Sequence, residues 1–219
     1  MNLLYLHGFA SSPGSTKAGI LRTAFAPYPV NYAVPDLNVP DFEHLTLTAM
    51  LERIAMTVRV LPPGPVGLIG SSFGGLAAVH FVDRYRFPEA ERITHMALLA
   101  PALDFMANRD AQLGAAGMER WRQQGYLDYH HYAYDRPLPV HYGLVEDVAQ
   151  YDSYAVEIEQ PALIYHGLYD ESVDYRQSVR FAEERPNVDL RLVESDHKLI
   201  DQTDAISAAL VDFFGLKRA

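Results

Sequence analysis

The sequence predicts an α/β fold in which a mostly parallel central sheet has helices on both faces. Short apolar runs recur along the chain, segments with helical spacing lie between them, and turn residues mark their boundaries. Continuously apolar strands of this kind suit a parallel sheet that is buried on both faces. Because strands and helices alternate over most of the 219 residues, we expect one doubly wound domain spanning residues 1–219.

The expected strands are the apolar runs that turn residues bound. They are Leu3–His7, Asn31–Val34, Val66–Gly70, Ile93–Ala100, Ala162–His166 and Val188–Val193. The expected helices lie between them, at Ser15–Phe25, Phe42–Val60, Gly74–Tyr85, Tyr175–Glu184 and Ile200–Phe214. The second helix has the clearest apolar stripe, and the sequence Pro62-Pro63-Gly64 ends it.

Residues 101–160 interrupt this alternation after the fourth core strand. A loop of that length inside a compact domain usually carries function or small helices of its own. We expect a helical cap insertion, either as a decoration with its own small core or as a cover over a pocket. Its candidate substrate-binding side chains are Phe105, Met106, Met118 and Trp121, which are of the kinds that line apolar pockets.

Composition excludes several classes of function. The formal net charge of −10 disfavours a nucleic-acid partner, and the absence of cysteine excludes disulfides, thiolate metal sites and a cysteine nucleophile. No apolar stretch approaches the roughly 18–20 residues that span a bilayer. Met1–Phe9 lacks a basic segment and is expected to form a strand rather than a signal peptide, which favours a cytoplasmic setting.

The segment around Ser72 predicts a nucleophile. A strand leads directly into G-x-S-x-G, formed by Gly70, Ser72 and Gly74, and then into a helix. This spacing suits a serine that projects from a tight strand-to-helix turn, where neighbouring side chains larger than glycine would collide. Ser71 does not fit, because its flanking positions would be Ile69 and Phe73.

The loop after the first strand is expected to supply one oxyanion donor. That strand ends in His7-Gly8, and the backbone N–H of Phe9 would act together with the N–H of Phe73, just after the nucleophile. His7 itself is expected to support this loop by hydrogen bonding rather than to act as a base.

Two later loops complete a Ser–Asp–His order. Asp170 follows the strand expected at 162–166, and His197 follows the strand expected at 188–193. Because parallel strands deliver their C-terminal loops to one edge of a sheet, both should converge on Ser72. We therefore expect His197 to be the general base and Asp170 to be the acid that orients it.

Other residues could fill these roles. Asp174 could be the acid, although its place near a helix start favours a capping role. His166 could be the base, but it is followed by glycine at a strand end. Asp196 is adjacent to His197 and is poorly placed to orient it. His130 and His131 lack the carboxylate spacing of a metal site, so no metal is expected.

The chain resembles the α/β-hydrolase superfamily and, more narrowly, the small bacterial esterases of the YqiA type. The narrower resemblance rests on the stretch Tyr5–Ala18, with His7-Gly8-Phe9, Ser11-Ser12-Pro13 and Lys17, and on Gly70–Gly75. It extends over residues 1–100 and from residue 161 to the end, whereas 101–160 is larger than those esterases need. The resemblance implies hydrolysis of a small-molecule acyl ester or thioester through an acyl-enzyme, without a cofactor.

The sequence leaves three functions open. The first is a serine esterase or thioesterase, and the second uses the same triad on peptide or carbon–carbon bonds. The third is a hydrolase fold that only binds a partner. The complete set of triad motifs and both oxyanion loops favour an enzyme, whereas the substrate and the oligomeric state are not specified by any motif.

Overall fold

A six-stranded parallel sheet forms the centre of the computed structural model, which describes residues 1–83 and 87–218. Its strand order is β2-β1-β3-β4-β7-β8, and every neighbouring pair is parallel. The strands are β1 (Asn2–Leu6), β2 (Asn31–Ala33), β3 (Val66–Ser71), β4 (Ile93–Leu99), β7 (Ala162–Gly167) and β8 (Val188–Val193). The predicted fold class is confirmed, and all six expected strands are present.

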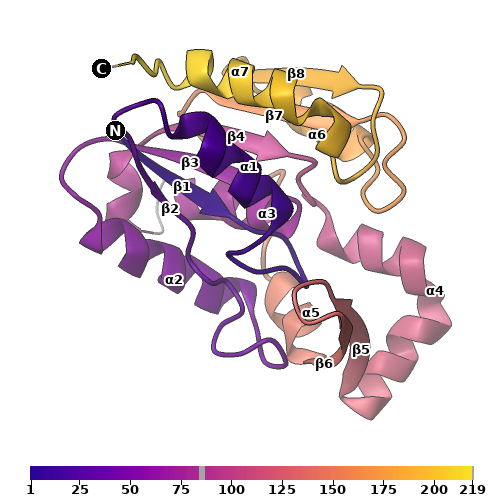
Figure 1. Ribbon diagram of the computed structural model, residues 1–219. Coiled ribbons are helices and arrows are strands. Elements are labelled where there is room, and N and C mark those ends of the chain that lie inside the picture. The colour runs from indigo at the N-terminus through magenta and orange to yellow at the C-terminus, as the bar shows by residue number, and fades with distance from the viewer. Residues whose placement is uncertain (84–86, 219) are drawn as a thin grey trace.

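Helices cover both faces of this sheet (Figure 1). One face packs against α1 (Thr16–Phe25) and α7 (Thr203–Phe213), and the other against α2 (Leu47–Val60), α3 (Phe73–Val82) and α6 (Arg176–Glu183). The described residues also include two short 3₁₀ helices, η1 (Pro88–Arg92), whose Ala90 joins the core, and η2 (Ile200–Gln202), which has no buried residue. The strands β1, β3 and β7 are buried along their whole length, as their apolar character predicts, whereas the edge strands β2 and β8 are partly exposed.

Several helix boundaries differ from the predicted ones. The helix expected at Phe42–Val60 begins only at Leu47, because the Thr46 side chain accepts the N–H of Ala49 at 3.1 Å and caps it there. The helix expected at Gly74–Tyr85 is described as Phe73–Val82, and its expected end at Tyr85 lies outside the described residues. The segment Ile200–Phe214 divides into η2 and α7.

The inserted segment, residues 101–160, is not only helical. It contains α4 (Phe105–Gln124), an antiparallel hairpin of β5 (Tyr126–His131) and β6 (Arg136–His141), and α5 (Gly143–Val148). The hairpin was not predicted. Its second strand contains two prolines, a residue normally depleted in strands, which a two-stranded sheet tolerates because each strand has a free edge.

Helix α4 is broken in the middle and anchored at its end. Gly114 has a non-helical backbone (φ 65°, ψ 169°) that divides the helix into two halves. In the second half, Trp121 is fully buried, and its Nε1–H donates to the carbonyl oxygen of Val140 in β6 at 2.9 Å. Gly125 then ends the helix in a left-handed conformation.

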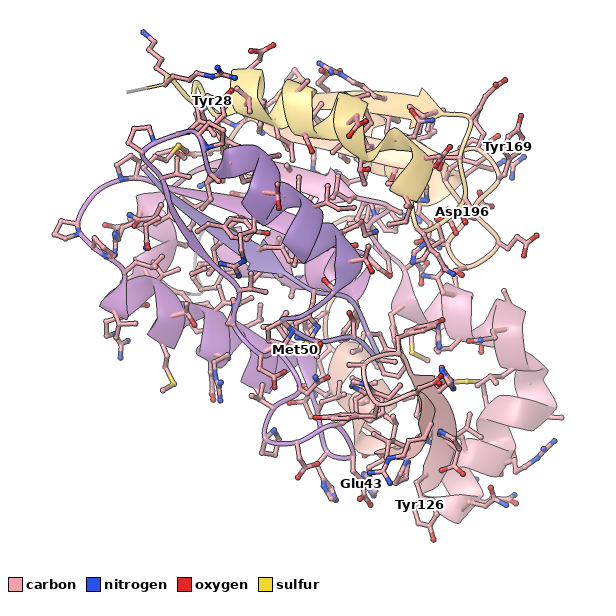
Figure 2. All side chains as sticks on the ribbon, in the orientation of Figure 1. Tyr28, Glu43, Met50, Tyr126, Tyr169 and Asp196 are labelled. Carbon is pink, nitrogen blue, oxygen red and sulfur yellow. The ribbon has the colours of Figure 1, made fainter. Side chains whose placement is uncertain are left out.

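The inserted segment docks on two loops of the core. The N–H of Tyr132 donates to the carbonyl oxygen of Ala10 at 3.0 Å, and the N–H of His141 donates to that of Glu43 at 2.7 Å. Tyr126 pairs with His141 in the hairpin, and Figure 2 shows Glu43 and Tyr126 close together at the edge of the inserted segment. None of the helices within residues 1–83 and 87–218 combines the length and apolar character needed to cross a membrane.

Candidate active site

Ser72 lies at the turn between β3 and α3, in a backbone conformation that few non-glycine residues adopt (φ 53°, ψ −117°). The turn is crowded, because a Cβ on Gly70 would lie 2.6 Å from the carbonyl oxygen of Gly74. A Cβ on Gly74 would collide with the carbonyl oxygen of Leu6 in β1. Packing therefore explains why glycine stands on both sides of this serine.

Two hydrogen bonds connect Ser72 to Asp170 through His197. His197 Nε2 lies 3.0 Å from Ser72 Oγ, and His197 Nδ1 lies 2.7 Å from Asp170 Oδ2. Because a carboxylate only accepts hydrogen bonds, Nδ1–H donates to Asp170, and Nε2 is free to accept from the serine hydroxyl. Ser71 is buried at the end of β3 and lies outside this chain of hydrogen bonds.

The loops after β7 and β8 bring Asp170 and His197 to the same edge of the sheet. The N–H of Tyr169 donates to the carbonyl oxygen of Ser195 at 3.0 Å, which ties one loop to the other. Figure 2 shows Tyr169 and Asp196 side by side at this edge. The convergence follows from the parallel pairing of the two strands.

The Asp170 carboxylate is fully enclosed and held by several donors. Its Oδ1 accepts the N–H groups of Ser172 and Val173, each at 2.8 Å. Burial alone would raise the pKa of Asp170, but hydrogen bonds from His166 and His197 hold that pKa well below its usual range. Asp170 is therefore a fixed negative charge at neutral pH.

His166 is a further member of this network, and the sequence prediction did not assign it this position. Its Nε2 lies 3.1 Å from Asp170 Oδ2 and 3.1 Å from the carbonyl oxygen of Val173. Since both are acceptors, Nε2 carries the proton, and Nδ1 accepts from the Ser178 hydroxyl at 2.7 Å. The only signal in the sequence was a histidine at the end of an expected strand, four residues before Asp170.

Phe73 directly follows Ser72, and the loop that carries Phe9 lies next to it, so both predicted oxyanion donors remain candidates. A Cβ on Gly8 would lie 3.2 Å from the Ser72 Cβ, so the loop that carries Phe9 passes directly beside the nucleophile. Within the described residues, neither the N–H of Phe9 nor that of Phe73 donates to another protein group. Two neighbouring free N–H groups can bind a developing oxyanion.

Two hydrogen bonds of the His7 ring hold the loop that carries Phe9. Its Nε2 accepts the N–H of Leu37 at 3.0 Å, which leaves Nδ1–H to donate to the carbonyl oxygen of Gly8, also at 3.0 Å. Both ring nitrogens are thus engaged in supporting the loop.

The alternative residues have local roles. Asp174 accepts the N–H of Arg176 at 2.9 Å, and Asp196 accepts the N–H of Lys198 at 2.8 Å, so each carboxylate serves its own turn. His130 is paired with Asp135 at 3.2 Å in the exposed hairpin. Across residues 1–83 and 87–218, no three His, Asp or Glu side chains form a group that could hold a metal ion.

Lys17, at the start of α1, adds a positive charge near the acidic loops. It is half-buried, and burial lowers the pKa of its ammonium to about 8, although the charges of Asp170 and Asp196 oppose this shift. Sequence reasoning included Lys17 only as part of the family resemblance.

The four candidate substrate-binding residues lie in α4 and differ in environment. Phe105 and Met106 line a cavity of about 200 Å³ next to α5. Met118 and Trp121 are buried beyond the Gly114 break, and the Trp121 ring contacts Tyr129 and Tyr142. The burial of Trp121 and its satisfied N–H favour a role in holding the hairpin, and its contribution to substrate binding stays a prediction.

Comparisons with known proteins agree with this fold. The model of a family described as Uncharacterised protein family (UPF0227) matches residues 2–215. A provisionally assigned hydrolase from Agrobacterium vitis S4 has a TM-score of 0.85 at 24% identity, covering 97% of this chain and 87% of that one. Among curated proteins, none matches the chain.

Two other solved structures have the same architecture. Est1E from Butyrivibrio proteoclasticus, solved with ferulic acid bound, has a TM-score of 0.81 at 19% identity and covers 97% of this chain and 87% of its own. Alpha/beta hydrolase domain-containing protein 10 from mouse has a TM-score of 0.80 at 17% identity, with 98% and 89% covered. At these sequence identities, the comparisons show a shared fold alone.

Proposed function

Because the chain belongs to the UPF0227 family and has the α/β-hydrolase fold, we propose that it is a serine hydrolase that cleaves carboxylic esters or thioesters. The observation that carries this proposal is the Ser72–His197–Asp170 chain, with hydrogen bonds of 3.0 and 2.7 Å beside two free backbone N–H groups. Est1E, whose structure contains ferulic acid, supports a substrate of the carboxylic ester type, because ferulic acid is a carboxylic acid such as ester hydrolysis would release.

In this mechanism, Ser72 Oγ attacks the acyl carbonyl while His197 Nε2 takes its proton. The oxyanion that forms accepts hydrogen bonds from the N–H groups of Phe9 and Phe73. The leaving alcohol or thiol then receives the proton from His197. A water molecule, deprotonated by the same nitrogen, attacks the acyl-enzyme. The bond between Ser72 Oγ and the acyl carbon then breaks, His197 returns the proton to Ser72 Oγ, and the carboxylic acid is released.

Asp170 fixes the imidazole tautomer and stabilises the cation that forms on His197 during each proton transfer. Its low pKa keeps it ionised throughout, and His166 Nε2–H helps to position it by donating at 3.1 Å to Oδ2, the same oxygen that His197 contacts. The inserted segment acts as a cap, with Phe105 and Met106 as candidate acyl-binding side chains and with Trp121 and Met118 behind them. No step requires a cofactor or a metal.

Labelling by a fluorophosphonate probe, read by intact mass, tests the nucleophile, and hydrolysis of p-nitrophenyl esters beside acyl-CoA thioesters tests the reaction. We expect one covalent adduct on the wild-type protein, none on Ser72→Ala, and turnover of at least one ester series. An unlabelled wild-type protein without turnover would favour a hydrolase fold that only binds its partner.

A further inference from the structure

Arg109 of α4 lies among three aromatic rings near the candidate active site. Its guanidinium carbon is 5.2 Å from the ring centroid of Phe105, 5.6 Å from that of Tyr129 and 5.8 Å from that of Phe9. The rings of Phe9 and Tyr129 are themselves packed edge to face at 4.9 Å. We call these three aromatic residues the Arg109 box.

The Arg109 box is continuous with the two oxyanion residues. Phe9 carries one of the free N–H groups, and its ring lies 6.2 Å from that of Phe73, which carries the other. Phe73 also contacts Phe105 at 5.2 Å. The guanidinium is therefore separated from the nucleophile turn by a single layer of aromatic rings.

Two polar atoms of this cluster have no hydrogen-bond partner among the described residues. Arg109 Nε and the Tyr129 hydroxyl are both buried and unpartnered. No carboxylate of the described chain lies within ion-pair distance of Arg109, whereas Arg122, on the outer face of the same helix, pairs with Glu119 at 2.7 Å. Ring faces stabilise a cation, but they do not accept the in-plane N–H bonds of a guanidinium.

Buried donors without acceptors point to a ligand that brings the acceptor. A carboxylate fits best, because its two oxygens match the guanidinium fork and can also accept from the Tyr129 hydroxyl. His197 must lie beside the leaving group to protonate it, whereas the Arg109 box contacts Phe73 through the rings of Phe9 and Phe105 and has no ring contact with His197 among the described residues. The acceptor therefore belongs on the acyl side of the scissile bond.

We propose that Arg109 and Tyr129 bind a carboxylate at the far end of the acyl group, so that the preferred substrates are half-esters or half-thioesters of short dicarboxylic acids. This inference rests on the proposed esterase function. It also explains how a chain of net charge −10 could select an anionic substrate, because the discrimination comes from a local cation.

A matched pair of substrates tests the inference. Mono-p-nitrophenyl glutarate carries the terminal carboxylate, and p-nitrophenyl pentanoate has a similar length without it. We expect Arg109→Met, which keeps length and apolar contact, to lower kcat/KM for the glutarate ester about 10- to 100-fold, mainly through KM. Turnover of the pentanoate ester should stay within about threefold of wild type, a change of less than one kcal/mol.

Two further variants control for folding and for general charge. Arg122→Met removes a cation from the exposed face of the same helix and should leave both substrates unaffected. Arg109→Lys keeps the charge without the fork and should retain part of the preference for glutarate. Equal losses on both substrates in Arg109→Met would overturn the inference and make Arg109 a structural residue of the cap.

A binding measurement separates this inference from the proposed function. Calorimetry with monomethyl glutarate on Ser72→Ala does not depend on turnover, and we expect binding that is lost in the Ser72→Ala, Arg109→Met double variant. Methyl pentanoate is the neutral control, and equal binding of the two ligands would contradict the inference. If the carboxylate ligand binds but the wild-type protein cleaves no ester, the inference stands and the esterase proposal fails.

Discussion

The loops at the edge of the sheet and the inserted segment differ in how many of their buried polar atoms have hydrogen-bond partners. Around Asp170, each histidine nitrogen and carboxylate oxygen has a protein partner. In the inserted segment, buried nitrogens or hydroxyls of Asn108, Arg109, Tyr129 and His131 have none among the described residues.

This difference is what our two proposals predict, because the catalytic hydrogen bonds form within the chain whereas the carboxylate site needs a ligand to supply its acceptor. A satisfied network fixes geometry before substrate arrives, as proton transfer requires. Unsatisfied groups in a second region can be completed by a ligand that brings the acceptor. The comparison predicts that variants of the loops change turnover for all substrates, whereas variants of the inserted segment change the choice among them.

The largest expected effect is that of Ser72→Ala. Removal of the nucleophile should lower kcat by roughly 10⁴-fold or more, leaving only the rate that binding and the oxyanion hole supply. Steady-state hydrolysis of a p-nitrophenyl ester measures this loss. Ser71→Ala is the control and should retain substantial activity, and a fluorophosphonate adduct on Ser71 would show that the nucleophile is misassigned.

Asp170→Asn should come next, with a loss in kcat of roughly 10³- to 10⁴-fold, because an amide favours the wrong imidazole tautomer. Circular dichroism should show a folded protein. Asp174→Asn removes a carboxylate that caps its own turn and should change kcat little. A loss confined to Asp174→Asn would reverse the assignment of the acid.

Replacement of His166 by alanine should lower kcat by about 10- to 100-fold, since the orienting carboxylate loses one donor worth on the order of 1.5–3 kcal/mol. The loss should be similar for acetyl and longer esters, with KM nearly constant. His166→Asn restores an N–H donor on a shorter side chain and should recover part of kcat. A change in KM alone would indicate a role in substrate binding instead.

For Trp121→Ala, the free energy of unfolding should fall by about 3–5 kcal/mol, because a fully buried indole is removed. If Trp121 also helps to bind the acyl group, the rise of kcat/KM with chain length should flatten while acetyl ester turnover stays nearly constant. Equal proportional losses across the ester series would make Trp121 purely structural. Trp121→Phe, which removes less volume, allows the same comparison if the alanine variant unfolds.

The smallest expected effect concerns Lys17 and pH. Because burial lowers its pKa from 10.5 to about 8, the unfolded chain holds this proton more tightly than the folded one. Its contribution to stability is therefore fully present above pH 10.5 and lost as the pH falls through 8. Urea unfolding of Lys17→Met and wild type should show a stability advantage for the variant at pH 7 that shrinks toward pH 10.5, and a constant difference would contradict this.

How far the sequence could predict the structure differs between the same two regions. The sheet and the Ser72 turn follow from local patterns, apolar runs and glycine spacing, and the parallel topology then brings Asp170 and His197 together. The hairpin escaped prediction because Pro137 and Pro139 obscure its second strand. The Arg109 box could not be predicted from the sequence either, because its three rings come from separate segments of the chain and meet only in the folded protein.

The backbone of Ser72 has a consequence for the history of this protein. A non-glycine residue at φ 53° and ψ −117° costs on the order of 1–3 kcal/mol, which the surrounding packing must offset in every folded molecule. Glycine at this position would relieve that cost, so selection for stability alone would favour replacement of the serine by glycine. A lineage that no longer needed the chemistry would drift toward glycine here, and retention of Ser72 among relatives would therefore record continuing selection for activity.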